Sequence, residues 1–195
     1  MHYNEAFTGY RPEGEQEIID RRAILELISE HGDALLTRDS EHWHLTASGF
    51  IVNEACTHVL MVYHNIYKSW SWTGGHADGE DDLLSVAMRE AQEETGAEVI
   101  SPLPEAISLD ILPVCAHFKR GKYVLPHMHL NLTYLLIAKE DAALAVKPDE
   151  NSGVKWIAFE DLVREVTEPP MLAIYGKIIG RIKQYKRNGC LGAGE

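Results

Sequence analysis

The sequence has few cysteines, little positive charge and no long apolar run. Cys56, Cys115 and Cys190 lie far apart and form no C-x-x-C pair, so they indicate neither a disulfide framework nor a cysteine metal site. The formal net charge of −12 argues against binding to nucleic-acid backbones or anionic membranes. No apolar run approaches the roughly 18 residues of a spanning helix, and the N-terminus lacks a basic-then-apolar signal. We therefore expect a cytoplasmic enzyme, with neither nucleic acid nor membrane as its partner.

The 195 residues, 45% of them hydrophobic, are enough for one domain with an extension. Residues 1–13 contain glycine and proline breakers and are expected to be irregular. The apolar spacing over residues 15–30 predicts an amphipathic helix, and a shorter helical piece is expected at 33–37. These segments form an N-terminal helical extension, residues 1–40. It either packs on the domain, which we favour, or contributes to a substrate lid or a homodimer surface.

Residues 41–195 show strand patterns interrupted by a central helix and closed by a last helix. This order predicts an α/β fold with a mixed β-sheet sandwiched between helices. The last helix begins at Pro169 and has an apolar stripe, with Lys177, Arg181 and Lys183 on its outer face. The expected strands cover residues 44–52, 58–64, 69–73, 106–118 with a break at Pro113, 127–138 and 154–158.

The most informative stretch runs from Gly75 to Ala97. Its apolar residues recur every three or four positions and predict a helix, on which Glu90, Glu93 and Glu94 share one sector. Carboxylates this close repel one another and raise one another's pKa, so we expect a positive charge nearby to compensate. Ligands that offer only oxygen suit a hard divalent cation, Mg²⁺ or Mn²⁺.

The sequence around this helix strengthens that interpretation. Gly74 and Gly75 predict a loop whose backbone closely approaches a ligand. Gly96 stands where a left-handed helix cap belongs. Arg89 is four residues before Glu93 and is expected to hold that carboxylate in a bidentate geometry.

The stretch resembles the Nudix box. That motif is a glycine, five residues, an acid, seven residues, and then R-E-aliphatic-x-E-E-x-G-aliphatic, and here it covers residues 75–97. Asp81 stands where the family has Glu, and the small Ala91 and Ala97 fill the aliphatic positions. The resemblance implies a Nudix-type α/β/α sandwich and MutT-like hydrolysis of a diphosphate linkage with Mg²⁺ or Mn²⁺.

The resemblance also implies roles for single residues. Glu93 and Glu94 match the principal metal ligands, while Glu90 matches a further ligand or, in some members, the general base. Gly75 is included in the expected metal site, and Arg89 in the catalytic set. Family members often take the base from a later loop, for which Glu150 is our first candidate. Glu168 is the second.

Several other side chains are candidates for substrate binding. His76 follows Gly75 and either contacts phosphate or metal or only shapes the loop. His127 and His129 share one strand face and are expected to line a cleft. We do not expect the pair to bind zinc, because the sequence shows no third ligand. Trp70 and Trp72 also share a strand face, where they either pack in the core or stack on a nucleobase.

The expected substrate is a small nucleoside diphosphate derivative, such as an ADP-ribose-like compound or a nucleotide sugar, ahead of a nucleoside triphosphate. Pro113 lies sixteen positions beyond Ala97, a spacing similar to that associated with ADP-ribose pyrophosphatases. Two alternatives remain open. One is a nucleotide-sensing Nudix domain without turnover, and the other is an enzyme resembling isopentenyl diphosphate isomerase, which would need a cysteine such as Cys56 or Cys115.

Overall fold

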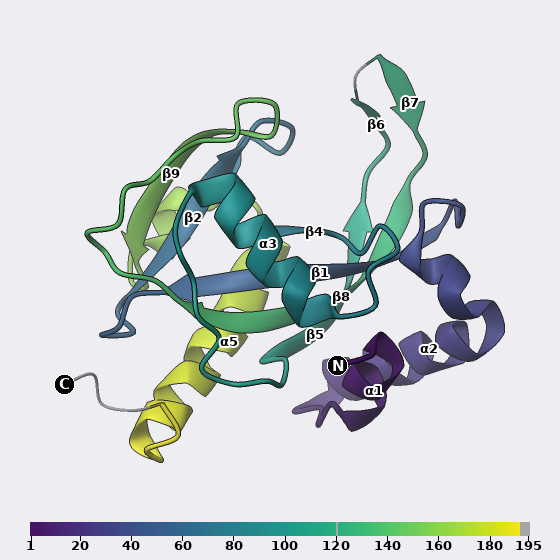
Figure 1. Cartoon of the computed structure of the whole chain (residues 1–195), viewed down its shortest axis with the longest axis horizontal. Helices are drawn as coiled ribbons and strands as arrows, with labels where there is room; N and C mark the ends of the chain where they lie inside the picture. The colour runs from purple at the N-terminus through teal and green to yellow at the C-terminus, as the bar shows by residue number, and fades with distance from the viewer. Residues whose placement is uncertain (120, 192–195) are drawn as a thin grey trace.

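The fold is a mixed β-sheet between helices, with a helical extension at the N-terminus. The computed structural model describes residues 1–119 and 121–191. Helix α3 covers one face of the sheet, and helix α5 lies behind the other (Figure 1). The helices are α1 (Tyr3–Gly9), α2 (Glu15–His31), the 3₁₀ helix η1 (Gly32–Leu36), α3 (Leu83–Thr95), α4 (Leu162–Glu165) and α5 (Pro169–Arg187). Among the described residues, no helix is long and apolar enough to cross a membrane.

The main sheet has seven strands, and two further strands form a hairpin that projects from the body (Figure 1). The strands of the main sheet are β1 (Trp43–Val52), β2 (His58–His64), β3 (Ser69–Ser71), β4 (Thr73–His76), β5 (Ser108–Val114), β8 (His127–Ile137) and β9 (Asn151–Ala158). The hairpin consists of β6 (His117–Lys119) and β7 (Lys122–Val124). The expected α/β sandwich with a mixed sheet is therefore confirmed.

Strand β1 is the centre of the sheet and is paired along both edges. Strand β8 runs parallel to it from Trp43, opposite Met128, to Val52, opposite Ile137. The other edge of β1 is shared, because β4 pairs with its middle, Thr46 to Gly49, and β2 only with its end. The sheet therefore splits along this edge, because β2 and β4 pair with different parts of β1.

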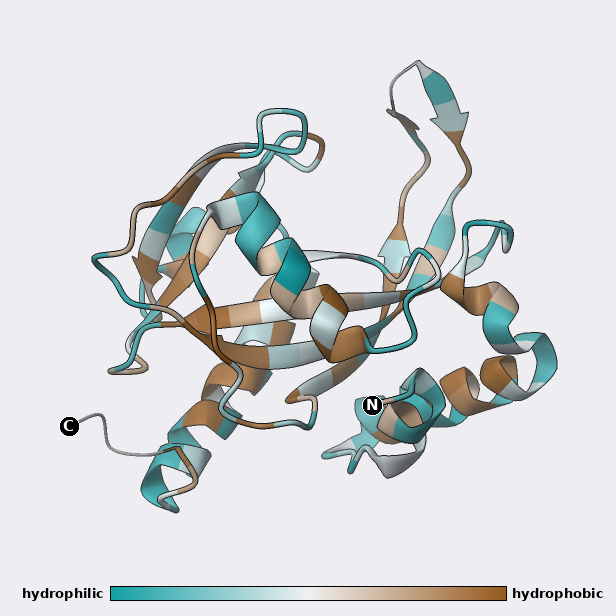
Figure 2. Ribbon diagram, viewed as in Figure 1, coloured by the Kyte–Doolittle hydropathy of each residue, from teal (hydrophilic) through white to brown (hydrophobic). Residues whose placement is uncertain are grey.

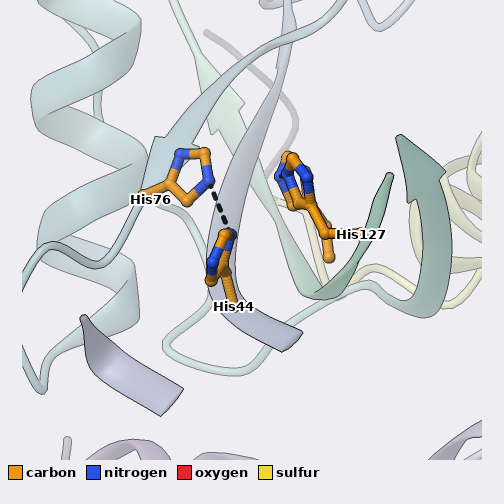
Figure 3. A group of neighbouring side chains, drawn as sticks. His44, His76 and His127 are labelled. Atoms are coloured by element: carbon orange, nitrogen blue, oxygen red, sulfur yellow. Dashed lines mark hydrogen bonds between the residues drawn. The ribbon is translucent and has the colours of Figure 1, made fainter. Parts of the chain in front are cut away.

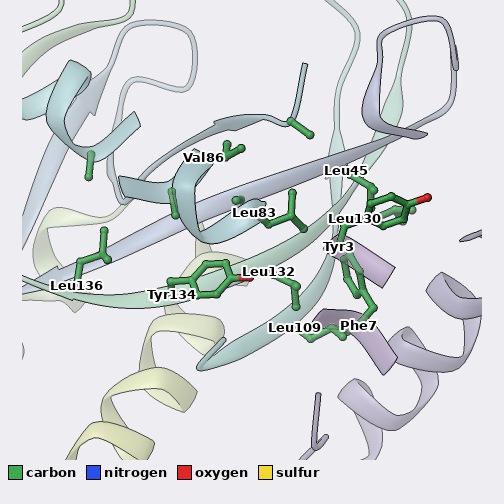
Figure 4. Close-up of a cluster of buried hydrophobic side chains, with 14 of the residues drawn as sticks. Tyr3, Phe7, Leu45, Leu83, Val86, Leu109, Leu130, Leu132, Tyr134 and Leu136 are labelled. Atoms are coloured by element: carbon green, nitrogen blue, oxygen red, sulfur yellow. The ribbon is translucent and has the colours of Figure 1, made fainter. Parts of the chain in front are cut away.

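Two apolar clusters hold the layers together, and brown segments mark hydrophobic residues along the strands of the sheet and along α5 in Figure 2. Side chains alternate along a strand, so Ile51 packs toward α3 and α1, whereas Phe50 and Val52 pack toward α5. In Figure 4 the α3 side chains Leu83 and Val86 lie over those of the sheet. The face that carries Phe50 becomes polar in the first half of β1, which leaves room for a cleft.

Residues 3–9 form helix α1, so the expectation of an irregular segment at residues 1–13 was wrong. Tyr3 and Phe7 are one helical turn apart, and both are buried in the cluster on the α3 side (Figure 4). The His2 side chain caps the helix by accepting a hydrogen bond from the backbone of Asn4 at 3.2 Å. The free energy gained by burying two aromatic rings outweighs the helix-breaking tendency of the nearby glycine and proline residues, which lie at the end of the helix and beyond it.

Part of the α5 face expected to be exposed is instead covered by the N-terminal extension, whereas Lys183 on that face is exposed as expected. Arg181 is buried, and its guanidinium lies 2.7 Å from the carboxylate of Glu17 on α2. Lys177 contacts the same carboxylate at 2.9 Å, as well as Asp110 of β5 at 2.7 Å. The expectation that Arg181 faces solvent was wrong. The extension packs on the domain through a buried ionic network, as we favoured.

Pro113 does not break its strand. Strand β5 is continuous, and Pro113 lies opposite Met128 of β8. Because β5 is the last strand in the order β3-β2-β1-β8-β5, one of its edges has no neighbouring strand in the described part of the chain. A proline without an N–H is tolerated at such an edge.

Candidate active site

Helix α3 has well-defined ends, which fix the position of its carboxylates. The Asp82 side chain accepts hydrogen bonds from the backbone of Leu84 and Ser85 at 3.1 and 3.4 Å, as an N-cap residue does. Gly96 ends the helix with a left-handed φ of 72°, as expected for a glycine at this position.

Gly74 and Gly75 belong to strand β4, so the expected glycine loop begins later than predicted. These glycines allow two close approaches. A Cβ on Gly75 would lie 2.6 Å from Cδ of Glu90, and one on Gly74 would lie 2.8 Å from the carbonyl oxygen of Ala47. The Gly74 N–H also donates a hydrogen bond to Glu94 Oε1 at 3.0 Å. Gly75 therefore lets the Glu90 side chain of α3 lie directly against β4, whereas Gly74 allows β4 to lie close to β1.

Glu90 and Glu94 are buried, with exposed fractions of only 8% and 4%. Together with Glu150, in the turn before β9, they form a group in which one carboxylate oxygen of each lies within 4.8 Å of the others. Burial, aided by the neighbouring carboxylates, raises the pKa of Glu94 to about 8. Burial also raises the pKa of Glu90. Such a group favours a bound cation, because a cation offsets both the desolvation and the repulsion.

Glu93 takes a different position from the one predicted. Its carboxylate is half-exposed and lies 3.0 Å from Lys147 Nζ, which also contacts Glu150 at 3.0 Å. Arg89 lies closer to Glu90, at 3.1 Å, than to Glu93, at 3.8 Å, and both contacts involve a single nitrogen. The predicted bidentate Arg89–Glu93 pair is therefore not formed. A role for Glu93 as a metal ligand stays a prediction.

The three grouped carboxylates border a cavity of about 870 Å³. Its wall includes the polar halves of β1 and β8, where the Asn131 side-chain oxygen accepts hydrogen bonds from Thr46 and Ser48 at 2.9 and 3.0 Å. His127 and His129 continue this wall, as the alternation along the strand predicted. Phe118 and Tyr123 of the β6–β7 hairpin also line the cavity. Substrate contact by these side chains stays a prediction.

Two histidines outside the H-x-H pair join it in this wall. His44 of β1, His76 of β4, His127 and His129 each place a ring nitrogen within 4.8 Å of the others. Figure 3 shows the rings of His44 and His76 facing each other, with His127 beside them. Burial is the main cause that lowers the pKa of His76 to about 2 and that of His129 to about 3, and it lowers the pKa of His44 as well. These three imidazoles are therefore neutral at neutral pH.

The sequence reasoning missed the role of His44. The H-L-T-A-S pattern of residues 44–48 alternates polar and apolar side chains in the same way as residues 127–133. This signal becomes meaningful only once the two strands are known to be neighbours, since their register places His44 opposite His129.

The two candidate tryptophans lie in different surroundings. Trp72 is buried, and its ring meets Tyr175 of α5 edge-on at 5.3 Å, although it also borders the cavity. Trp70 is not among the lining residues in the described part of the chain, and Lys155 Nζ covers its ring at 4.4 Å. The packing interpretation fits both rings better than stacking on a nucleobase.

Glu168, the second candidate for the base, borders the cavity but is outside the group of three carboxylates. Burial raises its pKa. Neither Cys56, which is buried beside α5, nor the exposed Cys115 is among the lining residues in the described part of the chain. The arrangement therefore offers no cysteine for an isomerase-like proton transfer.

A mixed sheet between helices, with buried carboxylates of one helix beside a large cavity, defines an α/β enzyme suited to metal-assisted chemistry on phosphates. Residues 42–177 match the model of the NUDIX domain family. The chain belongs to the Nudix family, and it is a pyrophosphohydrolase of that family. The resemblance inferred from residues 75–97 is confirmed. The domain boundary at residues 40 and 41 stays a prediction.

Solved structures share the fold. A Nudix-family hydrolase from Clostridium perfringens is 22% identical, with a TM-score of 0.50, and the match covers 71% of this chain and 97% of that one. An Ap4A hydrolase from C. elegans, in a binary complex, is 17% identical, with a TM-score of 0.51, over 72% of this chain and 98% of that one. No curated protein sequence matches the chain significantly.

Proposed function

We propose that the protein hydrolyses the diphosphate linkage of a nucleoside diphosphate derivative with the help of Mg²⁺ or Mn²⁺. The observation that supports this most strongly is the group of Glu90, Glu94 and Glu150 beside the cavity. Its oxygen-only donors and the raised pKa of its buried carboxyls fit a hard divalent cation. The volume of about 870 Å³ is in the range of pockets that enclose small molecules of this size.

In this proposal Glu90 and Glu94 hold the cation, and the Gly74 N–H fixes the orientation of the Glu94 carboxylate. When bound, the cation neutralises diphosphate oxygens and lowers the pKa of the attacking water. Glu150 accepts the proton of that water as general base. Lys147 positions Glu150 and Glu93 through its two contacts of 3.0 Å. Arg89 balances the charge of Glu90, which is 3.1 Å away.

The polar wall supplies contacts to the rest of the substrate. His76, His127, His129 and Asn131 offer hydrogen-bonding groups, while Phe118 and Tyr123 add aromatic surface on the hairpin. Aromatic side chains stack on nucleobases with little dependence on which base is present. These features favour an ADP-ribose-like compound or a nucleotide sugar as the class of substrate, before a nucleoside triphosphate.

The test is phosphate release, with a coupled phosphatase where needed, from nucleoside diphosphate sugars, dinucleotides and nucleoside triphosphates with Mg²⁺ and with Mn²⁺. We expect turnover that EDTA abolishes. Glu94→Gln should lower it by at least about 10³-fold, because the neutral amide holds the cation poorly. The exposed Glu98, just beyond the helix, provides the matched control Glu98→Gln, which should keep full activity. Tight binding of one compound without turnover would instead support a nucleotide-sensing domain.

A further inference from the structure

The four histidines of the cleft wall come from three strands that bring them together. The β1–β8 register sets His44 opposite His129, and the β1–β4 register sets His76 opposite Thr46, two residues from His44. His127 lies two residues before His129, on the same face of β8. Two nitrogen pairs are close, at 3.2 Å between His44 and His76 and 3.1 Å between His127 and His129.

The outer nitrogens of two rings are anchored to the backbone. His44 Nε2 lies 2.5 Å from the Ser40 carbonyl oxygen, and His127 Nδ1 lies 2.8 Å from that of Leu125. A carbonyl only accepts hydrogen bonds, so each of these nitrogens carries the proton. In the neutral form of each ring, the opposite nitrogen, His44 Nδ1 or His127 Nε2, has the lone pair, and it faces His76 Nε2 or His129 Nε2 within the cluster.

This is the arrangement found at metal centres, where a ligating histidine donates its other N–H to a carbonyl that fixes its tautomer and orientation. We propose that His44, His76, His127 and His129 form a binding site for a first-row transition-metal ion such as Zn²⁺ or Co²⁺, separate from the carboxylate group. His44 is the ligand that the sequence did not reveal, whereas His76 was a candidate for contact with phosphate or metal. His127 and His129, which the sequence placed only in the cleft wall, supply the other two ligands.

The distances fit such an ion. Four nitrogens around Zn²⁺ at about 2.0–2.1 Å in a tetrahedron are about 3.3 Å apart. The two close pairs are already near this spacing, and all four nitrogens lie within 4.8 Å of one another. The half-buried rings of His76 and His129 have the freedom to close the remaining gap.

The donor atoms separate the two sites. Imidazole suits Zn²⁺, Co²⁺, Ni²⁺ and Cu²⁺, whereas the carboxylate oxygens of Glu90, Glu94 and Glu150 suit Mg²⁺ and Mn²⁺. Neutral imidazoles leave the ion with its full double charge in the wall of the same cavity. Such an ion attracts an anionic group through its charge rather than through an open ligand position, because four imidazoles fill a tetrahedral site.

The test uses the full-length chain freed of metal with a chelator and dialysed into excess Mg²⁺. Titration with Co²⁺ is followed by visible absorption and equilibrium dialysis, and we expect one tightly bound Co²⁺ per chain, which Zn²⁺ displaces. His129→Gln and His44→Gln should each weaken binding by at least about 100-fold, since even loss of a residue that supports a ligand costs 10–100-fold. The exposed His31 at the end of α2 gives the control His31→Gln, which should bind as the wild type does.

Glu94→Gln separates this proposal from the proposed hydrolase function. It should abolish Mg²⁺-dependent turnover and leave Co²⁺ binding unchanged. Thermal melting checks that each variant is folded, and His129→Gln serves if His44→Gln is not. Lack of tight Co²⁺ uptake by the wild type would overturn the proposal. Uptake that survives both histidine substitutions, or is lost in Glu94→Gln, would overturn it as well.

Discussion

Arg181→Met is expected to destabilise the protein strongly, because it leaves the carboxylate of Glu17 buried beside weaker partners. Glu17 is fully buried, and Arg181 contacts both of its oxygens, at 2.7 and 2.8 Å. Burial alone would raise the pKa of Glu17, but the hydrogen bonds from Arg181, from the Glu13 backbone N–H and from Lys177 outweigh it and lower the pKa from 4.5 to about 2. This shift is equivalent to about 3 kcal/mol. Breaking a buried ion pair costs about 3–5 kcal/mol.

The remaining contacts place the expected loss at the lower end of that range. Lys177 stays 2.9 Å from Glu17, and the Tyr10 hydroxyl still donates a hydrogen bond to it at 2.9 Å. We therefore expect the free energy of unfolding to fall by about 3 kcal/mol at pH 7. Urea denaturation followed by tryptophan fluorescence measures it. The exposed Lys183 on the same helix gives the control Lys183→Met, which should change the free energy by less than about 0.5 kcal/mol.

The pH dependence tests the cause of the loss. The folded pKa of Glu17 lies below the unfolded value, so its contribution is complete above about pH 4.5 and is lost as pH falls toward 2. The difference between wild type and Arg181→Met should therefore be largest at pH 5 and above and shrink below about pH 4. A loss of less than about 1 kcal/mol at pH 7, or a difference that stays constant down to pH 3, would refute the reasoning.

Three further predictions concern the active site. Glu150→Gln should lower turnover at saturating Mg²⁺ without changing the affinity for Mg²⁺. Unchanged turnover would mean that Glu90 or another group is the base, and weaker Mg²⁺ binding would mean that Glu150 is a ligand. Because burial raises the pKa of Glu94 to about 8, protons compete with Mg²⁺ for this carboxylate below that pH. The Mg²⁺ affinity measured by calorimetry should therefore rise by up to about tenfold per pH unit until about pH 8, and an affinity that does not change with pH would contradict this. Gly75→Ala should weaken Mg²⁺ binding, since its Cβ would lie 2.6 Å from the Glu90 carboxyl carbon; Gly176→Ala, with open space around it, is the control, and equal binding by both variants would refute the close approach.

The local features of the site were predictable because their signals lie close together in the sequence. The cap residue Gly96 and the helix that carries Glu90 and Glu94 follow from residue spacing alone. The choice among the three glutamates does not. Lys147 lies 54 residues beyond Glu93 and contacts both Glu93 and Glu150, yet of these two it is Glu150 that groups with Glu90 and Glu94. A helical pattern identifies a sector of carboxylates, but contacts from distant residues decide which of them face the same point.

Burial of charge was the least predictable feature of the fold. Arg181 follows the rule that a charged residue between apolar stripes faces solvent, yet it is buried because α2 brings Glu17 to it. The partner lies 164 residues away in the sequence. Neither residue alone indicates burial, since an unpaired charge would be too costly inside the protein. Only the packing of the extension on α5 makes both positions favourable.

The four histidines illustrate the same limit at the functional site. The sequence showed His127 and His129 on one strand face and His76 beside a glycine, but a metal site also needs ligands from neighbouring strands at compatible heights. That information is contained in the pairing of β1 with β8 and β4, where a shift of one residue would turn His44 to the opposite face of the sheet. Strand register therefore decides whether these four side chains are isolated wall residues or one donor set, and the Co²⁺ titration of the histidine variants tests that register directly.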